Sequence, residues 1–135
     1  SPNVTDISEI ALAAESAGAD AVSMINTLTG MRIDINTKRP IIHNNTGGFS
    51  GPALLPIAVR MVWQTYQKVK IPIVGLSTWQ DAVEMLLAGA TALQIGTVLF
   101  TDPYAPVKIT EGLTNYMDKN GVKTLSELTG AMRPW

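Results

Sequence analysis

Apolar residues recur along the chain with two spacings in turn, one typical of helices and one typical of buried strands. A capping box at residues 6–9 opens a helix that Gly18 ends, and its apolar positions are Ile7, Ile10, Ala11 and Ala14. Further helices are predicted at about 52–69, from Ser77 or Thr78 to Ala88, and at about 106–119. A second capping box at 124–127 opens a short last helix. Apolar runs at 21–25, 71–74 and 92–95 predict three strands.

The order of these elements predicts an α/β fold. The segment Ala17-Gly18-Ala19-Asp20-Ala21-Val22 resembles Ala88-Gly89-Ala90-Thr91-Ala92-Leu93, and each lies where a helix gives way to a strand. Repeated junctions of this kind favour a parallel sheet. The strands are apolar throughout, which predicts that both faces of the sheet are covered. Three strands are too few to close a barrel.

The connection at residues 28–51 is unusually long. It contains the alternation Ile33-Asp34-Ile35, a polar turn at 36–39 and then Pro40-Ile41-Ile42, which together predict a small hairpin excursion. Connections of this length are often functional.

Composition narrows the possible partners. The chain carries 10 basic and 11 acidic residues without a long run of either sign, so nothing favours a nucleic acid or an anionic membrane surface. There is no cysteine and only one histidine, His43, so no metal-ligand set is predicted. No apolar run is long enough to span a membrane, and the start lacks the features of a signal peptide. We expect a soluble, cytoplasmic protein that binds a small neutral or anionic ligand.

Polar residues and glycines follow each predicted strand. Asn26-Thr27 follows the first strand, Gly75 the second and Gly96-Thr97 the third. In parallel α/β folds the ligand lies at the carboxyl ends of the strands. Gly96-Thr97 offers amide groups and a hydroxyl that suit a phosphate, although an ordinary strand-to-helix turn would look the same. Gly47-Gly48-Phe49-Ser50-Gly51 could present its amides to an anion or could be a flexible loop.

Three ordered motifs resemble one enzyme family over essentially the whole chain. They are Met24-Ile25-Asn26-Thr27-Leu28-Thr29-Gly30-Met31-Arg32-Ile33-Asp34, Thr46-Gly47-Gly48-Phe49-Ser50-Gly51-Pro52, and Ala88-Gly89-Ala90 through Gly96-Thr97. Their order and spacing are similar to the NAD-linked, heteromeric class of dihydroorotate dehydrogenases. The related fumarate-using class has Asn-Ser where this chain has Asn26-Thr27. The resemblance implies that residues 1–135 are the C-terminal half of a single FMN-binding (β/α)8 TIM barrel.

The resemblance also implies roles for individual residues. Ile25 would contact FMN through its backbone, Asn26 and Thr27 would bind the pyrimidine, and Gly51, Gly75, Gly96 and Thr97 would bind the cofactor, the last two at its phosphate. The implied activity is that of a flavoprotein oxidoreductase of pyrimidine biosynthesis, which oxidises dihydroorotate to orotate. A homodimer is implied, with a partner subunit that carries FAD and a [2Fe-2S] cluster and passes electrons to NAD. An amide such as Asn26 can donate to and accept from the planar imide edge of orotate.

The chain departs from the family at two places. The lysine that contacts the flavin and the cysteine that acts as the base lie before Ser1 in the family, so no catalytic residue is expected here and the 135 residues alone should be inactive. The family reads Gly-Met-Gly-Gly-Ile-Ser where this chain reads Gly75-Leu76-Ser77, and we expect residues to have been omitted there and before Ser1. Two alternatives stay open: another FMN barrel that acts on pyrimidines, and a non-catalytic half-barrel that binds a phosphate.

Overall fold

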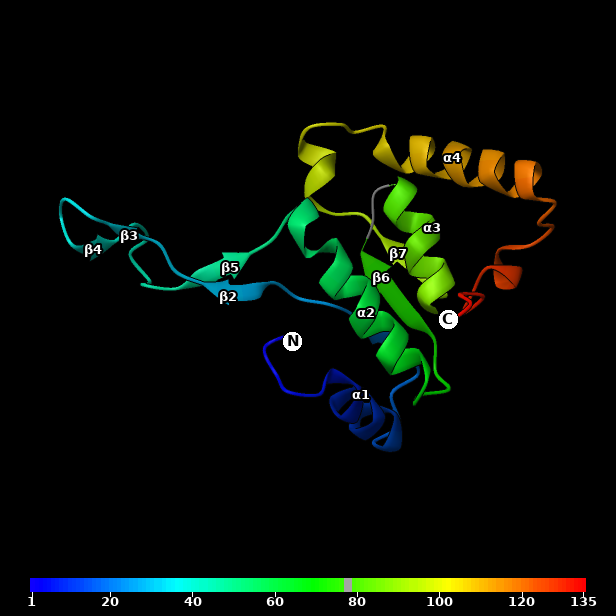
Figure 1. The fold of residues 1–135 in the computed structure, drawn as a ribbon, viewed down its shortest axis with the longest axis horizontal. Coiled ribbons are helices and arrows are strands. Elements are labelled where there is room, and N and C mark those ends of the chain that lie inside the picture. Colours follow the sequence, from blue (N-terminus) through cyan, green and yellow to red (C-terminus); the bar gives the residue numbers. More distant parts are fainter. Residues whose placement is uncertain (77–78) are drawn as a thin grey trace.

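A three-stranded parallel sheet with helices packed against it forms the body of the molecule (Figure 1). The computed structural model describes residues 1–76 and 79–135. The sheet comprises β1 (Val22–Ser23), β6 (Ile73–Leu76) and β7 (Ala92–Gln94), with β6 in the middle. The helices are α1 (Ile7–Ser16), α2 (Leu55–Tyr66), α3 (Trp79–Ala88) and α4 (Ala105–Asn120). The predicted α/β class and the parallel sheet are therefore confirmed, whereas closure into a barrel stays a prediction.

Local signals set the ends of α1 and α4 close to where the sequence predicted them, whereas α2 spans 55–66 instead of 52–69, with the 3-10 turn Pro52–Leu54 before it. The side chain of Asp6 accepts a hydrogen bond from the N–H of Ser8 and caps α1. Gly121 ends α4 with a φ of +68°, a left-handed conformation that glycine adopts without strain. The second capping box forms at Thr124 and Glu127, although the helix that it opens is a single 3-10 turn, Leu125–Glu127. The predicted cap at Ser77 or Thr78 lies outside the described residues.

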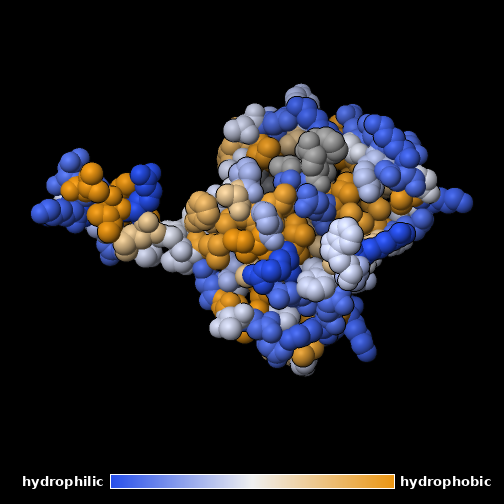
Figure 2. All heavy atoms as spheres, viewed as in Figure 1, coloured by the Kyte–Doolittle hydropathy of each residue, from blue (hydrophilic) through white to orange (hydrophobic). Residues whose placement is uncertain are grey.

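An antiparallel arm projects from the body and confirms the predicted hairpin excursion. Strand β2 (Leu28–Gly30) pairs with β5 (Gly47–Phe49), and β3 (Ile33–Asp34) pairs with β4 (Arg39–Pro40) further out. Figure 1 shows the arm extending away from the sheet, and Figure 2 shows apolar side chains near its tip. The exposed apolar residues of this part of the arm are Ile33, Ile35, Ile41 and Ile42. Three of the five residues of the predicted glycine loop therefore form strand β5, because Gly47, Gly48 and Phe49 pair with β2.

Two apolar clusters hold the body together. The first lies where the sheet meets α1 and α2 and includes Met24, Val62 and Ile73. The second joins α3 to α4 and to the segment after it, through Leu86, Ile109 and Leu128. Close packing of these buried side chains fixes the order α1, α2, α3, α4 along the sheet.

The other face of the sheet is open. Side chains alternate along a strand, and Val22 and Leu93 pack into the first cluster. Ser23, Ala92 and Gln94 therefore project from the opposite face, and all three are exposed. The expectation that both faces are covered is not met by the part of the chain that the structure describes, because these three side chains are exposed.

Candidate functional site

The carboxyl ends of the three parallel strands lie at one edge of the sheet. Val22 and Ser23 pair in register with Ile73 and Val74, and β6 pairs in the same direction with β7. Asn26-Thr27 follows β1 and Gly96-Thr97 follows β7, so the two predicted groups emerge at the same edge. The predicted gathering of polar strand ends is confirmed at the level of topology.

Asn26 lies at the surface, just past the end of β1. Its Oδ1 accepts hydrogen bonds from the backbone N–H of Thr27 at 2.7 Å and from the Thr27 hydroxyl at 3.4 Å. The side-chain carbonyl is therefore anchored to its neighbour, which fixes the orientation of the amide. The arrangement leaves an oriented, exposed carboxamide next to a half-buried hydroxyl. Such a pair can donate to and accept from a planar polar ligand.

Asn3, which the sequence did not single out, holds the segment after Asn26 in place. Its Nδ2 donates to the carbonyl of Thr27 at 3.0 Å, and its Oδ1 accepts from the N–H of Thr29 at 2.8 Å. One amide side chain thus satisfies two backbone groups that lie either side of Leu28. Only a structure could reveal this contact, because 24 residues separate Asn3 from Thr27.

The glycines of β5 lie against the same segment. A Cβ built on Gly48 would overlap the Thr27 side chain, so a glycine is required for this close approach. The arm and the end of β1 are therefore packed directly together. Asn3, Thr27 and Gly48 form one connected group beside Asn26.

The predicted cofactor positions fall into three structural settings. The side chain of Ile25 is 6% exposed and belongs to the first cluster, so only its backbone is available to a ligand. Gly51 (φ +119°) and Gly96 have open space where a Cβ would be, and Thr97 is exposed. Gly75 differs, because it lies inside β6 rather than after it, and a Cβ there would meet Met85 and Ala90. Strand β6 extends two residues beyond the predicted end because its ladder with β7 continues to Leu76.

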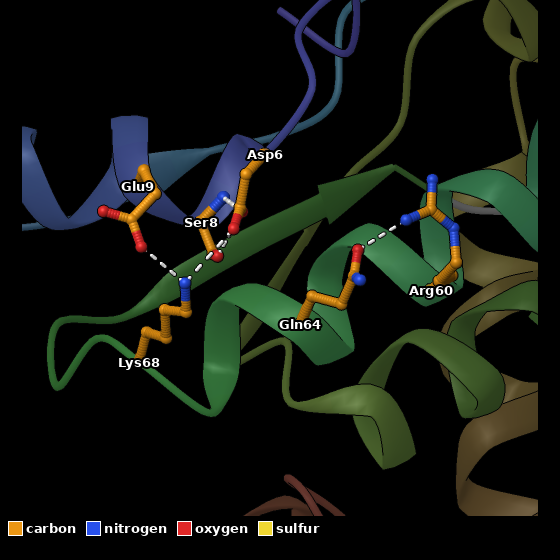
Figure 3. Close-up of polar contacts among 6 residues, drawn as sticks. All are labelled: Asp6, Ser8, Glu9, Arg60, Gln64 and Lys68. Atoms are coloured by element: carbon orange, nitrogen blue, oxygen red, sulfur yellow. Dashed lines mark hydrogen bonds and ion pairs between the residues drawn. The ribbon is translucent and has the colours of Figure 1, made fainter.

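The clearest electrostatic feature lies at other residues, between the start of α1 and the end of α2 (Figure 3). Lys68 Nζ lies 2.5 Å from a carboxylate oxygen of Glu9 and 3.2 Å from one of Asp6. Hydrogen bonds from the Ser8 hydroxyl and from Lys68 lower the pKa of Asp6 to about 2. Hydrogen bonds to Glu9 and Asp6 raise the pKa of Lys68. Lys68 therefore bridges two acidic side chains.

The predicted site itself is uncharged. Beyond the 3-10 helix Thr97–Phe100, Lys108 Nζ lies 2.7 Å from an oxygen of Asp102. The hydrogen bond from Lys108 lowers the pKa of Asp102.

Outside positions 77 and 78, the chain has no cluster of three acidic or histidine side chains that could hold a metal. In the same residues, no helix combines the length and apolar character needed to cross a membrane.

A parallel sheet with an oriented amide and open glycines at its carboxyl edge defines an α/β domain, the class of fold in which ligands usually lie at that edge. A family model described as dihydroorotate dehydrogenase matches residues 1–117. The chain belongs to the dihydroorotate dehydrogenase family.

The chain resembles curated relatives named dihydroorotate dehydrogenase B (NAD(+)), catalytic subunit. It is 57% identical to the one from Parabacteroides distasonis over 98% of this chain and 44% of that protein. It is 56% identical to the one from Bacteroides thetaiotaomicron over 98% of this chain and 45% of that protein. The chain therefore spans less than half the length of the relatives it matches.

Proposed function

We propose that the protein to which this chain belongs oxidises dihydroorotate to orotate, as an FMN-dependent oxidoreductase of pyrimidine biosynthesis. The observation that carries the proposal is the oriented carboxamide of Asn26 at the carboxyl end of β1, in a chain matched by the family model over residues 1–117. The names of the relatives supply the reaction and its electron acceptor, NAD.

In this proposal, Asn26 and Thr27 bind the pyrimidine. The Asn26 carboxamide faces the polar edge of the ring, where its N–H2 group donates to a ring carbonyl, because its oxygen already accepts from Thr27. The Thr27 hydroxyl adds a second contact. Asn3 and Gly48 keep these two residues in position, since one binds the backbone on both sides of Leu28 and the other packs on Thr27.

The residues at the other strand ends fit the proposed cofactor. The exposed Gly51 and Gly96 leave open space beside their Cα atoms, so a flat ring or a phosphate can approach the backbone closely. Ile25 offers only backbone groups, and the Thr97 hydroxyl can donate to a phosphate oxygen. Gly75 remains in the proposed set through its backbone. When bound, FMN would accept the hydride that leaves the pyrimidine ring.

The oxidation breaks two C–H bonds of the dihydropyrimidine, one releasing a hydride and the other a proton, and forms the ring C=C bond. We assign the proton acceptor to the part of the protein outside these 135 residues, in keeping with the family resemblance. In this proposal, a partner subunit with FAD and a [2Fe-2S] cluster would carry the electrons from FMN on to NAD. We further propose a TIM barrel, a homodimeric catalytic subunit and a cytoplasmic location.

Substitution of Asn26 by alanine tests the proposed substrate contact. In the full-length protein, Asn26→Ala should weaken orotate binding about tenfold, because a hydrogen-bonding partner of the ring is lost, and should leave FMN bound. Orotate affinity is measured by titration of the flavin spectrum, and FMN content by its absorbance after release. Asn115→Ala, which removes an exposed amide from α4, is the matched control.

Three outcomes would contradict the proposal. Equal losses of orotate and FMN in Asn26→Ala would make Asn26 part of the scaffold instead of the substrate site. A wild-type protein that binds flavin but reacts with dihydrouracil instead of dihydroorotate would be a different pyrimidine oxidoreductase. A protein without bound flavin would refute the cofactor assignment.

A further inference from the structure

A side-chain hydrogen bond joins two strands of the sheet that are not neighbours. The Ser23 hydroxyl, on β1, donates to Oε1 of Gln94, on β7, at 2.7 Å. Strand β6 lies between them in the sheet. Because adjacent strands lie about 4.8 Å apart, this contact spans roughly 10 Å of sheet, and only a long side chain such as glutamine can reach across it.

The bond crosses the open face of the sheet. Ser23 pairs in register with Val74, and Gln94 pairs with Leu76, so the glutamine side chain reaches diagonally across β6. Both residues are exposed, on the side away from the helices. A hydrogen bond here does not serve the apolar cores, which lie on the other side.

Each partner stands just before a predicted ligand-binding segment. Ser23 precedes Asn26 by three residues, and Gln94 precedes Gly96 by two. Ser23 and Gln94 are the last residues of β1 and β7, so the bond lies within two or three residues of both segments. Backbone pairing links each outer strand only to β6, so the Ser23–Gln94 bond is a direct link between the segments proposed for the pyrimidine and for the phosphate.

We infer, on the basis of the proposed function, that Ser23 and Gln94 are positioning residues that fix the distance between the pyrimidine site at Asn26 and the phosphate site at Gly96. The bond links the two outer strands directly across the central strand. It holds the two outer strands in one relative position, so that a substrate bound at one strand end meets a cofactor bound at the other. Neither side chain touches the ligands.

Steady-state kinetics and FMN titration of full-length variants test this inference. Ser23→Ala removes the donor, and Gln94→Met removes the acceptor while keeping the length of the side chain. Each should raise both the KM for dihydroorotate and the Kd for FMN about fivefold, the loss expected for one neutral hydrogen bond. The double variant should be no worse than either single variant, because both remove the same bond.

Two further variants separate positioning from general damage. Ser23→Thr keeps the hydroxyl and should restore wild-type constants. Gln64→Met removes the acceptor of another glutamine hydrogen bond, the one from Arg60 on the surface of α2 (Figure 3), and should change neither constant. Constants that stay unchanged in Ser23→Ala and Gln94→Met, or losses that multiply in the double variant, would overturn the inference.

Amide hydrogen exchange gives a readout that needs no activity. Gln94→Met should speed exchange at the N–H of Thr27, on the far strand end, and Ser23→Ala should speed it at the N–H of Leu99, which bonds to the Gly96 carbonyl. Faster exchange that is confined to the mutated strand would refute the proposed link between the two strands. If wild-type protein does not oxidise dihydroorotate, the proposed function fails, while the exchange result still decides whether the two strand ends are coupled.

Discussion

Replacing Gly89 with alanine should destabilise the protein more than the same change at Gly18, although both residues occupy the same place in the repeated helix-to-strand junction. Both have a positive φ, +94° at Gly18 and +121° at Gly89. Around Gly18 nothing lies within 4 Å of a built Cβ. At Gly89 the Cβ would overlap the ring of Tyr66, which also covers Gly130 in the segment near the end of the chain.

Comparing the two variants separates the cost of backbone strain from the cost of overpacking. An alanine held at positive φ costs about 1–3 kcal/mol, and this strain applies to both positions. Overpacking against the Tyr66 ring adds about 1–3 kcal/mol at Gly89 alone. We therefore expect the free energy of unfolding to fall by about 1–3 kcal/mol in Gly18→Ala and by about 2–6 kcal/mol in Gly89→Ala.

Urea unfolding of the single variants, and of Gly89→Ala combined with Tyr66→Ala, measures these terms. Without the Tyr66 ring, the added cost of Gly89→Ala should fall but stay above that of Gly18→Ala, because the Cβ of residue 66 still overlaps the introduced methyl group. Equal losses for the two single variants would refute the packing argument. So would an unchanged cost of Gly89→Ala in the Tyr66→Ala background.

Three further perturbations test other contacts. Thr65 is fully buried and its hydroxyl has no hydrogen-bonding partner in the described structure. Thr65→Val should therefore raise the free energy of unfolding by about 1 kcal/mol. A lower free energy of unfolding in urea would mean that the hydroxyl makes a hydrogen bond. Asp6→Asn keeps the helix cap but removes the charge that faces Lys68. Because the pKa of Asp6 is lowered from 3.8 to about 2 in the folded protein, the charge stabilises above pH 4, and the difference in Tm from wild type should vanish as the pH falls from about 4 to 2. A difference that persists at pH 2 would assign the effect to something other than the charge. Asn3→Ala should weaken orotate binding severalfold by releasing the backbone at Thr29, whereas Asn3→Asp should retain the acceptor and lose less; equal orotate affinity in all three proteins would exclude the positioning role.

Helix ends were predictable because the signals that fix them are local. The capping box at Thr124 and the left-handed Gly121 act within a few residues of the chain, and α4 differs from its predicted range by one residue at each end. Strand ends were not predictable to the same degree. The extension of β6 through Gly75 and the pairing of Gly48 in β5 depend on partners elsewhere in the chain. Their sequence is rich in glycine, which favours a loop unless a neighbouring strand supplies the hydrogen bonds.

The candidate site shows the same division between local and long-range information. Asn26 could be picked out because a polar residue directly after a buried strand is a local pattern. The contacts of Asn3 and the bond between Ser23 and Gln94 join residues that are 24 or more positions apart, and no spacing rule connects them. These contacts orient the polar groups at the strand ends. The sequence thus indicates which residues face a ligand, whereas the fold determines how firmly they are held.

The glycines illustrate why structure is needed to interpret a motif. In the sequence, Gly48, Gly75, Gly89 and Gly96 all lie in segments that match the family or adjoin them. In the fold, the first three lie against side chains of Thr27, Met85 and Tyr66, so packing within the chain already accounts for the absence of a Cβ. Gly96 has a negative φ and no atom of the chain beside it. Packing therefore gives no reason for a glycine at Gly96, whereas the proposed approach of a phosphate to its backbone would give one.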